Sequence, residues 1–101
     1  MTNATAMLSA LGDPTRQAIL DKLTHGPLAV GQLADVLPVS RPAVSQHLKA
    51  LKEAGLVRDE ARGAARIYSI HTPGLRALRD WIEGFWDEAL DSFKTYAEKQ
   101  E

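Results

Sequence analysis

The sequence contains no cysteine among its 101 residues. This absence excludes disulfides, thiolate metal ligands and thiol redox sensing. No apolar run approaches the roughly 18 residues that a bilayer-spanning helix needs. The first residues, MTNATAMLSALGD, lack the basic region and long apolar stretch of a secretory signal. We therefore expect a cytoplasmic protein with no membrane partner.

What the chain does contain is typical of one small globular domain, which we place at residues 1–101. The apolar content is 45% and the charged content 25%, and the length allows one hydrophobic core rather than two. The net charge of −1 conceals an uneven distribution. Residues 38–66 hold six basic and three acidic residues, whereas residues 80–101 hold seven acidic and two basic. The basic middle indicates an acidic partner for that part of the chain.

Helix signals recur through the first half of the sequence. We expect short helices over residues 4–11 and 14–24, the second capped by Asp13. A third helix over residues 30–37 is followed, after a short break, by a helix over residues 41–54 that Ser40 caps and Gly55 ends. Two short helices joined by a three-residue break are typical of a helix-turn-helix.

The second half predicts a hairpin and a long helix. Residues 56–59 and 65–70 are rich in strand-forming residues and flank a turn at Arg62-Gly63, with basic residues throughout positions 58–66. Residues 73–99 then show one long helical pattern. The expected fold is mainly α with a small β-hairpin, a winged helix-turn-helix. We call residues 58–66 the wing.

The helix over residues 41–54 suggests nucleic-acid binding. If Val44, Leu48 and Leu51 face the core, helix geometry turns the polar residues of the first turns to solvent. Arg and Gln are the side chains that pair with guanine and adenine, and the start of a second helix enters the major groove in such motifs. The predicted DNA-binding residues are Ser40, Arg41, Pro42, Ser45, Gln46, His47, Lys49, Lys52, Arg62 and Arg66. For His47 we favour a role in supporting the helix.

Three stretches resemble the ArsR family of bacterial winged-helix transcriptional regulators. They are ALGDPTRQAIL at 10–20, LAVGQLADVLPVSRPAVSQHLKALKEAGLV at 28–57 and RGAARIYSI at 62–70. The resemblance covers about Ala6 to Phe93. It implies a homodimer joined by its first and last helices, with paired recognition helices on an inverted-repeat operator in double-stranded DNA. It also implies repression by blocking polymerase.

The chain departs from the metal-sensing members of that family. Arsenic-type and cadmium-type members use cysteines, and QLADVL offers none. Zinc-type members use histidine and carboxylate ligands on the last helix, where this chain has carboxylates but no histidine. Oxygen ligands alone select poorly for transition metals. We expect no metal site and no cofactor, and the absence of phosphate loops and nucleophile motifs predicts that the chain is not an enzyme.

The last helix carries more apolar residues than one small domain covers. Together with the first helix it predicts a dimer interface made by Met7, Leu8, Leu11, Leu78, Trp81, Ile82, Phe85, Trp86, Leu90 and Phe93. Two alternatives stay open. The aromatic residues could line a pocket for a small-molecule effector, or the chain could be a winged-helix protein-interaction module without sequence-specific DNA binding.

Overall fold

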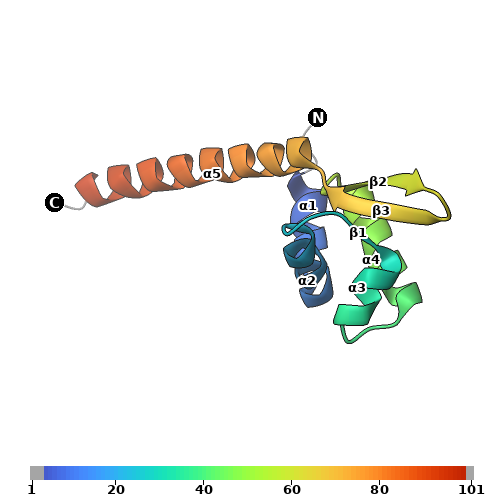
Figure 1. Cartoon of the computed structure of the whole chain (residues 1–101). Helices are drawn as coiled ribbons and strands as arrows, with labels where there is room; N and C mark the ends of the chain where they lie inside the picture. Colours follow the sequence, from blue (N-terminus) through green and yellow to red (C-terminus); the bar gives the residue numbers. More distant parts are fainter. Residues whose placement is uncertain (1–3, 100–101) are drawn as a thin grey trace.

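The computed structural model describes residues 4–99, which form five helices and three short strands (Figure 1). In chain order they are α1 (Ala4–Leu11), α2 (Pro14–Leu23), β1 (Leu28–Ala29), α3 (Val30–Val36), α4 (Arg41–Glu53), β2 (Val57–Arg62), β3 (Ala65–Ile70) and α5 (Thr72–Lys99). The strands form one antiparallel sheet in the order β1-β3-β2. The expected winged helix-turn-helix is confirmed, with α4 as its second helix and β2-β3 as its hairpin.

The helix starts follow from local capping chemistry. The Asp13 carboxylate accepts hydrogen bonds from the backbone N–H groups of Thr15 at 2.8 Å and Arg16 at 3.2 Å. Ser40 Oγ accepts one from the backbone N–H of Ala43 at 3.3 Å. In both helices a proline occupies the first turn, where its missing N–H leaves no hydrogen bond unmade. Both predicted caps are confirmed.

One strand was not predicted. Leu28 and Ala29 form a two-residue strand that pairs with Tyr68 and Ile67 of β3. The hairpin is also longer than expected, because β2 continues to Arg62, which pairs with Ala65 across the turn at Gly63. The sheet therefore has three strands instead of two.

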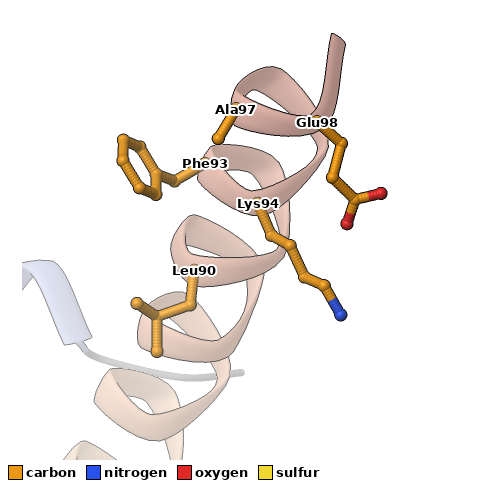
Figure 2. Close-up of a pocket in the computed structure, with 5 residues that line it drawn as sticks. All are labelled: Leu90, Phe93, Lys94, Ala97 and Glu98. Carbon is orange, nitrogen blue, oxygen red and sulfur yellow. The ribbon is translucent and has the colours of Figure 1, made fainter. Parts of the chain in front are cut away.

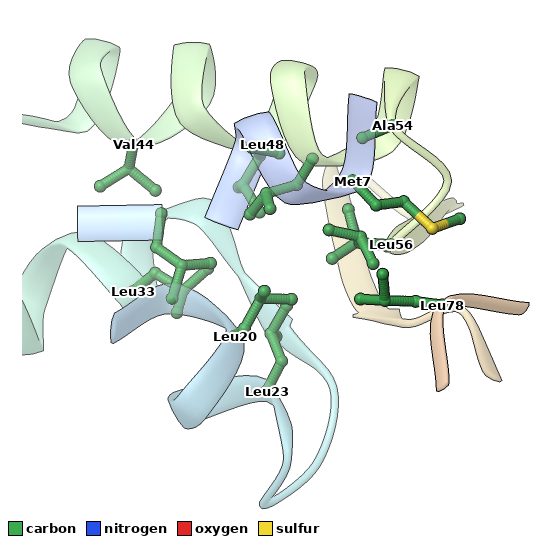
Figure 3. Packing of buried hydrophobic residues seen from close by; sticks show 13 residues of the cluster. Met7, Leu20, Leu23, Leu33, Val44, Leu48, Ala54, Leu56 and Leu78 are labelled. Atoms are coloured by element: carbon green, nitrogen blue, oxygen red, sulfur yellow. The ribbon is translucent and has the colours of Figure 1, made fainter. Parts of the chain in front are cut away.

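The core lies where α1, α2, α3 and α4 meet the base of the sheet (Figure 3). Its fully buried side chains are Ile19, Leu33, Val44, Leu48, Leu51 and Leu56. Three of them are the predicted buried residues of α4, which confirms the orientation of that helix. Because this face points inward, the opposite face of α4 is directed to solvent.

The start of α5 packs closely against the end of α4. Gly55 adopts a positive φ of 82°, which favours glycine and turns the chain from α4 into β2. A Cβ added at Gly74 would lie 1.8 Å from the carbonyl oxygen of Gly55. The backbone N–H of His71 also donates to the carbonyl oxygen of Leu56 at 2.9 Å. From this junction α5 extends away from the rest of the chain (Figure 1).

Candidate nucleic-acid interface

The first turns of α4 present an exposed polar surface. Val44, Leu48 and Leu51 are buried on the inner side of the helix. The predicted DNA-binding residues on the outer side are all exposed, namely Ser40, Arg41, Pro42, Ser45, Gln46, Lys49 and Lys52. This is the arrangement that an α-helix needs to enter a major groove while its other side holds the domain together.

Arg41 lies against the start of α3. The position that a Cβ would take at Gly31 is 3.1 Å from Arg41 Nη2 and 3.3 Å from its Cζ. A side chain at Gly31 would therefore displace the guanidinium. Gly31 was not among the predicted site residues, and nothing in its sequence neighbourhood indicates this contact, which joins two helices.

His47 differs from its neighbours on α4 because it is half-buried. Its Nδ1 accepts a hydrogen bond from Nε of Arg16 in α2, at 3.2 Å. An accepting Nδ1 places the ring proton of neutral histidine on Nε2. The contact ties α4 to α2, which agrees with a supporting role. Arg16 and His47 are 31 positions apart in the sequence.

The cap of α2 lies beside this contact. The backbone N–H of Arg16 donates to the Asp13 carboxylate and, together with the N–H of Thr15, lowers the pKa of Asp13 below its ordinary value of 3.8. Burial opposes that shift, and the positive charge of Arg16 adds to it. Asp13 therefore remains ionised at neutral pH and keeps the start of α2, and with it Arg16, in place.

Two basic residues of the wing, Arg62 and Arg66, are in ion pairs, as is Lys52 of α4. Asp59 of β2 contacts both Lys52 Nζ of α4 and Arg66 Nη1 of β3, each at 2.8 Å. The hydrogen bond from Lys52, followed by that from Arg66, lowers the pKa of Asp59. Arg62 contacts Glu60 at 3.1 Å. Three of the predicted DNA-binding cations thus have an acidic partner, whereas Arg41 and Lys49 have none within residues 4–99.

The predicted interface residues divide into two groups. Those that remain exposed or partly exposed are Leu8, Leu11, Trp81, Ile82, Phe85, Trp86, Leu90 and Phe93. Met7 and Leu78 are instead buried in the core of the chain itself, at 4% and 6% exposure. Met7 and Leu78 follow the same helical spacing as the exposed apolar residues of α1 and α5. On each helix, part of the apolar side packs in the core and the rest is exposed or partly exposed. Met7 and Leu78 therefore have little area left for a partner.

The exposed apolar side of α5 forms no enclosed pocket. The rings of Trp81 and Phe85 stack with centroids 5.8 Å apart. Near the end of the helix an open hollow is lined by residues of α5 alone (Figure 2). Leu90, Phe93 and Ala97 project from one side of the helix, and Lys94 and Glu98 project from the other (Figure 2). A single helix has no second wall with which to enclose a ligand.

Residues 4–99 contain no cluster of three or more histidine or acidic residues arranged to hold a metal ion. None of their helices combines the length and the hydropathy needed to cross a membrane.

The sequence and the fold both match known regulators. Residues 13–59 match the family described as "Bacterial regulatory protein, arsR family". The chain is 57% identical to the HTH-type transcriptional regulator Rv2034 of Mycobacterium tuberculosis, over 83% of this chain and 78% of that protein. It is 35% identical to the transcriptional repressor SdpR of Bacillus subtilis, over 78% of this chain and 88% of the repressor.

A solved structure of the same family has a similar fold. An ArsR-like transcriptional regulator from Rhodococcus sp. RHA1 superposes with a TM-score of 0.76 at 34% identity, covering 94% of this chain and 92% of that one. None of these relatives supports a protein-interaction module. The chain belongs to the arsR family of bacterial regulatory proteins and is a DNA-binding transcriptional regulator rather than an enzyme.

Proposed function

We propose that the protein is a homodimeric repressor that binds an inverted-repeat operator through α4 and the wing. The observation that carries the DNA-binding part is the exposed first turns of α4, where Arg41, Ser45 and Gln46 face away from the buried residues of the same helix. Arg and Gln make the bidentate contacts with guanine and adenine that distinguish base pairs in the major groove. The basic residues Lys49, Lys52, Arg62 and Arg66 would contact phosphates.

The dimer would form through the exposed apolar side of α1 and α5. Trp86 and Phe93 are 60% and 67% exposed, and Tyr96 lies on the same helix at 62%. Contiguous apolar surface exposed on a small chain marks an interaction site. A second copy of the chain would cover them symmetrically, and the pairing would set the distance between the two α4 helices. Half-sites in the operator would then lie about 34 to 36 Å apart, or a multiple of that distance.

Repression and cytoplasmic location are part of the same proposal. A dimer on an operator near a promoter blocks polymerase, and one relative is named as a repressor. A small-molecule effector remains an alternative use of the aromatic residues. It would have to bind between two subunits, because the hollow on α5 is formed by one helix.

The first test is a selection of bound fragments from genomic DNA by the purified protein at two salt concentrations. We expect an inverted repeat that remains enriched at the higher salt. Sequence-independent phosphate binding weakens steeply with salt, whereas base contacts preserve discrimination. Binding that shows no motif and disappears at higher salt would contradict the proposal.

The second test replaces one base-contacting residue. Gln46→Ala removes an exposed side chain, so the fold should be unaffected, and it should reduce discrimination at one base pair by about 1 to 3 kcal/mol. Lys49→Ala is the matched control on the same exposed surface and should weaken binding to all sequences alike. Competition with operators carrying single substitutions measures both. Equal weakening on every sequence by Gln46→Ala would contradict its assignment as a base contact.

A further inference from the structure

Asp59 occupies an unexpected place for an acidic residue on a DNA-binding surface. Its two carboxylate oxygens contact different cations, Oδ1 with Lys52 Nζ and Oδ2 with Arg66 Nη1, each at 2.8 Å. These three residues come from α4, β2 and β3. The Asp59 side chain is 7% exposed, whereas those of Lys52 and Arg66 are 53% and 54% exposed. The carboxylate is therefore covered and the two cations remain accessible.

The outer part of the wing makes no buried apolar contact with α4. Every residue from Glu60 to Arg66 is exposed, so no buried apolar side chain fixes this part of the hairpin against α4. Asp59 is the last partly covered residue of β2 before the turn. The ion pair from Asp59 to Lys52 is accordingly a direct polar link between the wing and the recognition helix.

Both cations keep hydrogen-bonding capacity after they bind Asp59. A lysine ammonium has three donors and an arginine guanidinium has five, and Asp59 contacts one nitrogen of each. Because the two oxygens of one carboxylate are neighbours, the ammonium and the guanidinium are held side by side. Their remaining donors suit the oxygens of a phosphate, which accepts charge-assisted hydrogen bonds.

We propose that Asp59 is a positioning residue that holds Lys52 and Arg66 together as one binding site for a single backbone phosphate of DNA, spanning α4 and the wing. The inference rests on the proposed DNA surface and adds to it a specific residue and its role. Preorganising two flexible cations removes the entropy that each would otherwise lose on binding. Asp59 thus strengthens DNA binding despite its negative charge.

Simple electrostatics predicts the opposite. A negative charge on the binding surface repels DNA, and removing it should strengthen binding and steepen the dependence on salt. The two explanations therefore differ in the sign of one measurement. Asp59→Asn keeps the size of the side chain and removes its charge, which makes it the informative substitution.

The experiment measures affinity for a short labelled duplex of random sequence, as a function of salt between about 50 and 200 mM. We expect Asp59→Asn to weaken binding by about five- to tenfold at the lower salt and to reduce the slope of log K against log salt by about one, because one phosphate is no longer neutralised. Thermal unfolding should shift by only a few degrees, since ion pairs whose cations are solvent-exposed contribute little to stability.

Glu60→Gln is the matched control. It removes the same charge from the next residue of β2, where Glu60 is paired with Arg62 and both side chains are exposed. We expect this variant to bind as tightly as the native protein or slightly more tightly. If Asp59→Asn and Glu60→Gln both strengthen binding, charge alone accounts for the effect and the inference is wrong. If both weaken it to the same extent, the effect is not particular to Asp59 and the inference is wrong as well.

A double variant separates failure of the inference from failure of the proposed function. Lys52→Ala/Arg66→Ala should weaken binding, and adding Asp59→Asn should change it no further. If the double variant binds like the native protein, the proposed DNA surface is itself wrong. If it weakens binding while Asp59→Asn alone strengthens it, the surface stands and only the role of Asp59 is refuted.

Discussion

The part of the chain before Leu78 and the part after it use similar residues in opposite ways. Before Leu78, the large apolar side chains of α2 and α4 are buried against one another. After it, no residue through Lys99 is buried, although this segment contains two tryptophans and two phenylalanines. Burial of apolar surface is the main favourable term in folding. One chain is therefore sufficient to bury the apolar residues before Leu78, which we call the body, whereas the apolar side chains of α5 after Leu78 remain exposed.

The largest effect should come from the body. Leu48→Ala removes a fully buried side chain of α4 and should lower the free energy of unfolding by about 2 to 5 kcal/mol, through lost burial and the cavity left behind. Val36→Ala is the control, because Val36 is 57% exposed and should change stability by less than about 0.5 kcal/mol. Urea unfolding followed by circular dichroism measures both, and equal losses would contradict the described core.

The next effect concerns association rather than folding. Phe93→Ala should leave the helical content unchanged and weaken self-association by at least about tenfold, since aromatic residues are frequent hot spots of interfaces. Asp91→Ala is the matched control, because residues two apart point to different sides of a helix. Sedimentation equilibrium compares the two. A dimer that both variants preserve would mean that this side of α5 is not the interface.

The smallest expected effect is a pH dependence of stability that comes from Asp59. The pKa of Asp59 is lowered in the folded protein, first by the hydrogen bond from Lys52. A lowered folded pKa means that the stabilisation is present above the unfolded value, near 3.8, and is lost as the pH falls through the folded value. We expect the native protein to be more stable than Asp59→Asn at pH 7, by up to about 1 kcal/mol. This difference should shrink as the pH falls below 3.8. A difference that persists in strong acid would assign the effect to packing.

Features that depend on residues close together in the sequence were predicted, whereas features that depend on residues far apart in the sequence were missed. The orientation of α4 followed from Val44, Leu48 and Leu51, whose spacing within a few turns carries the information. The strand β1 was missed because two residues have no periodicity, and it exists only through its pairing with β3. The start of α5 was expected at residue 73 and lies at Thr72, within the usual uncertainty of helix boundaries.

The candidate site shows the same division. The exposed residues of α4 were identified because they lie opposite the local apolar spacing. The partners of three of the basic residues were not identified. Arg16 bonds to His47 across 31 positions, and Asp59 joins Lys52 to Arg66 from another strand. Sequence gives the charges of such groups, but only the tertiary structure determines which charges meet.

The junction between Gly55 and Gly74 joins the end of α4 to the start of α5. Its contact is between backbone atoms, so no side-chain rotation is available there to absorb displacement. The hydrogen bond from His71 to Leu56 fastens the same place. A backbone contact of this kind couples the directions of the two helices, and the whole of α5 is a lever arm about 40 Å long at 1.5 Å per residue. In the proposed dimer, a small change in the angle between the two levers would rotate both recognition helices relative to the operator.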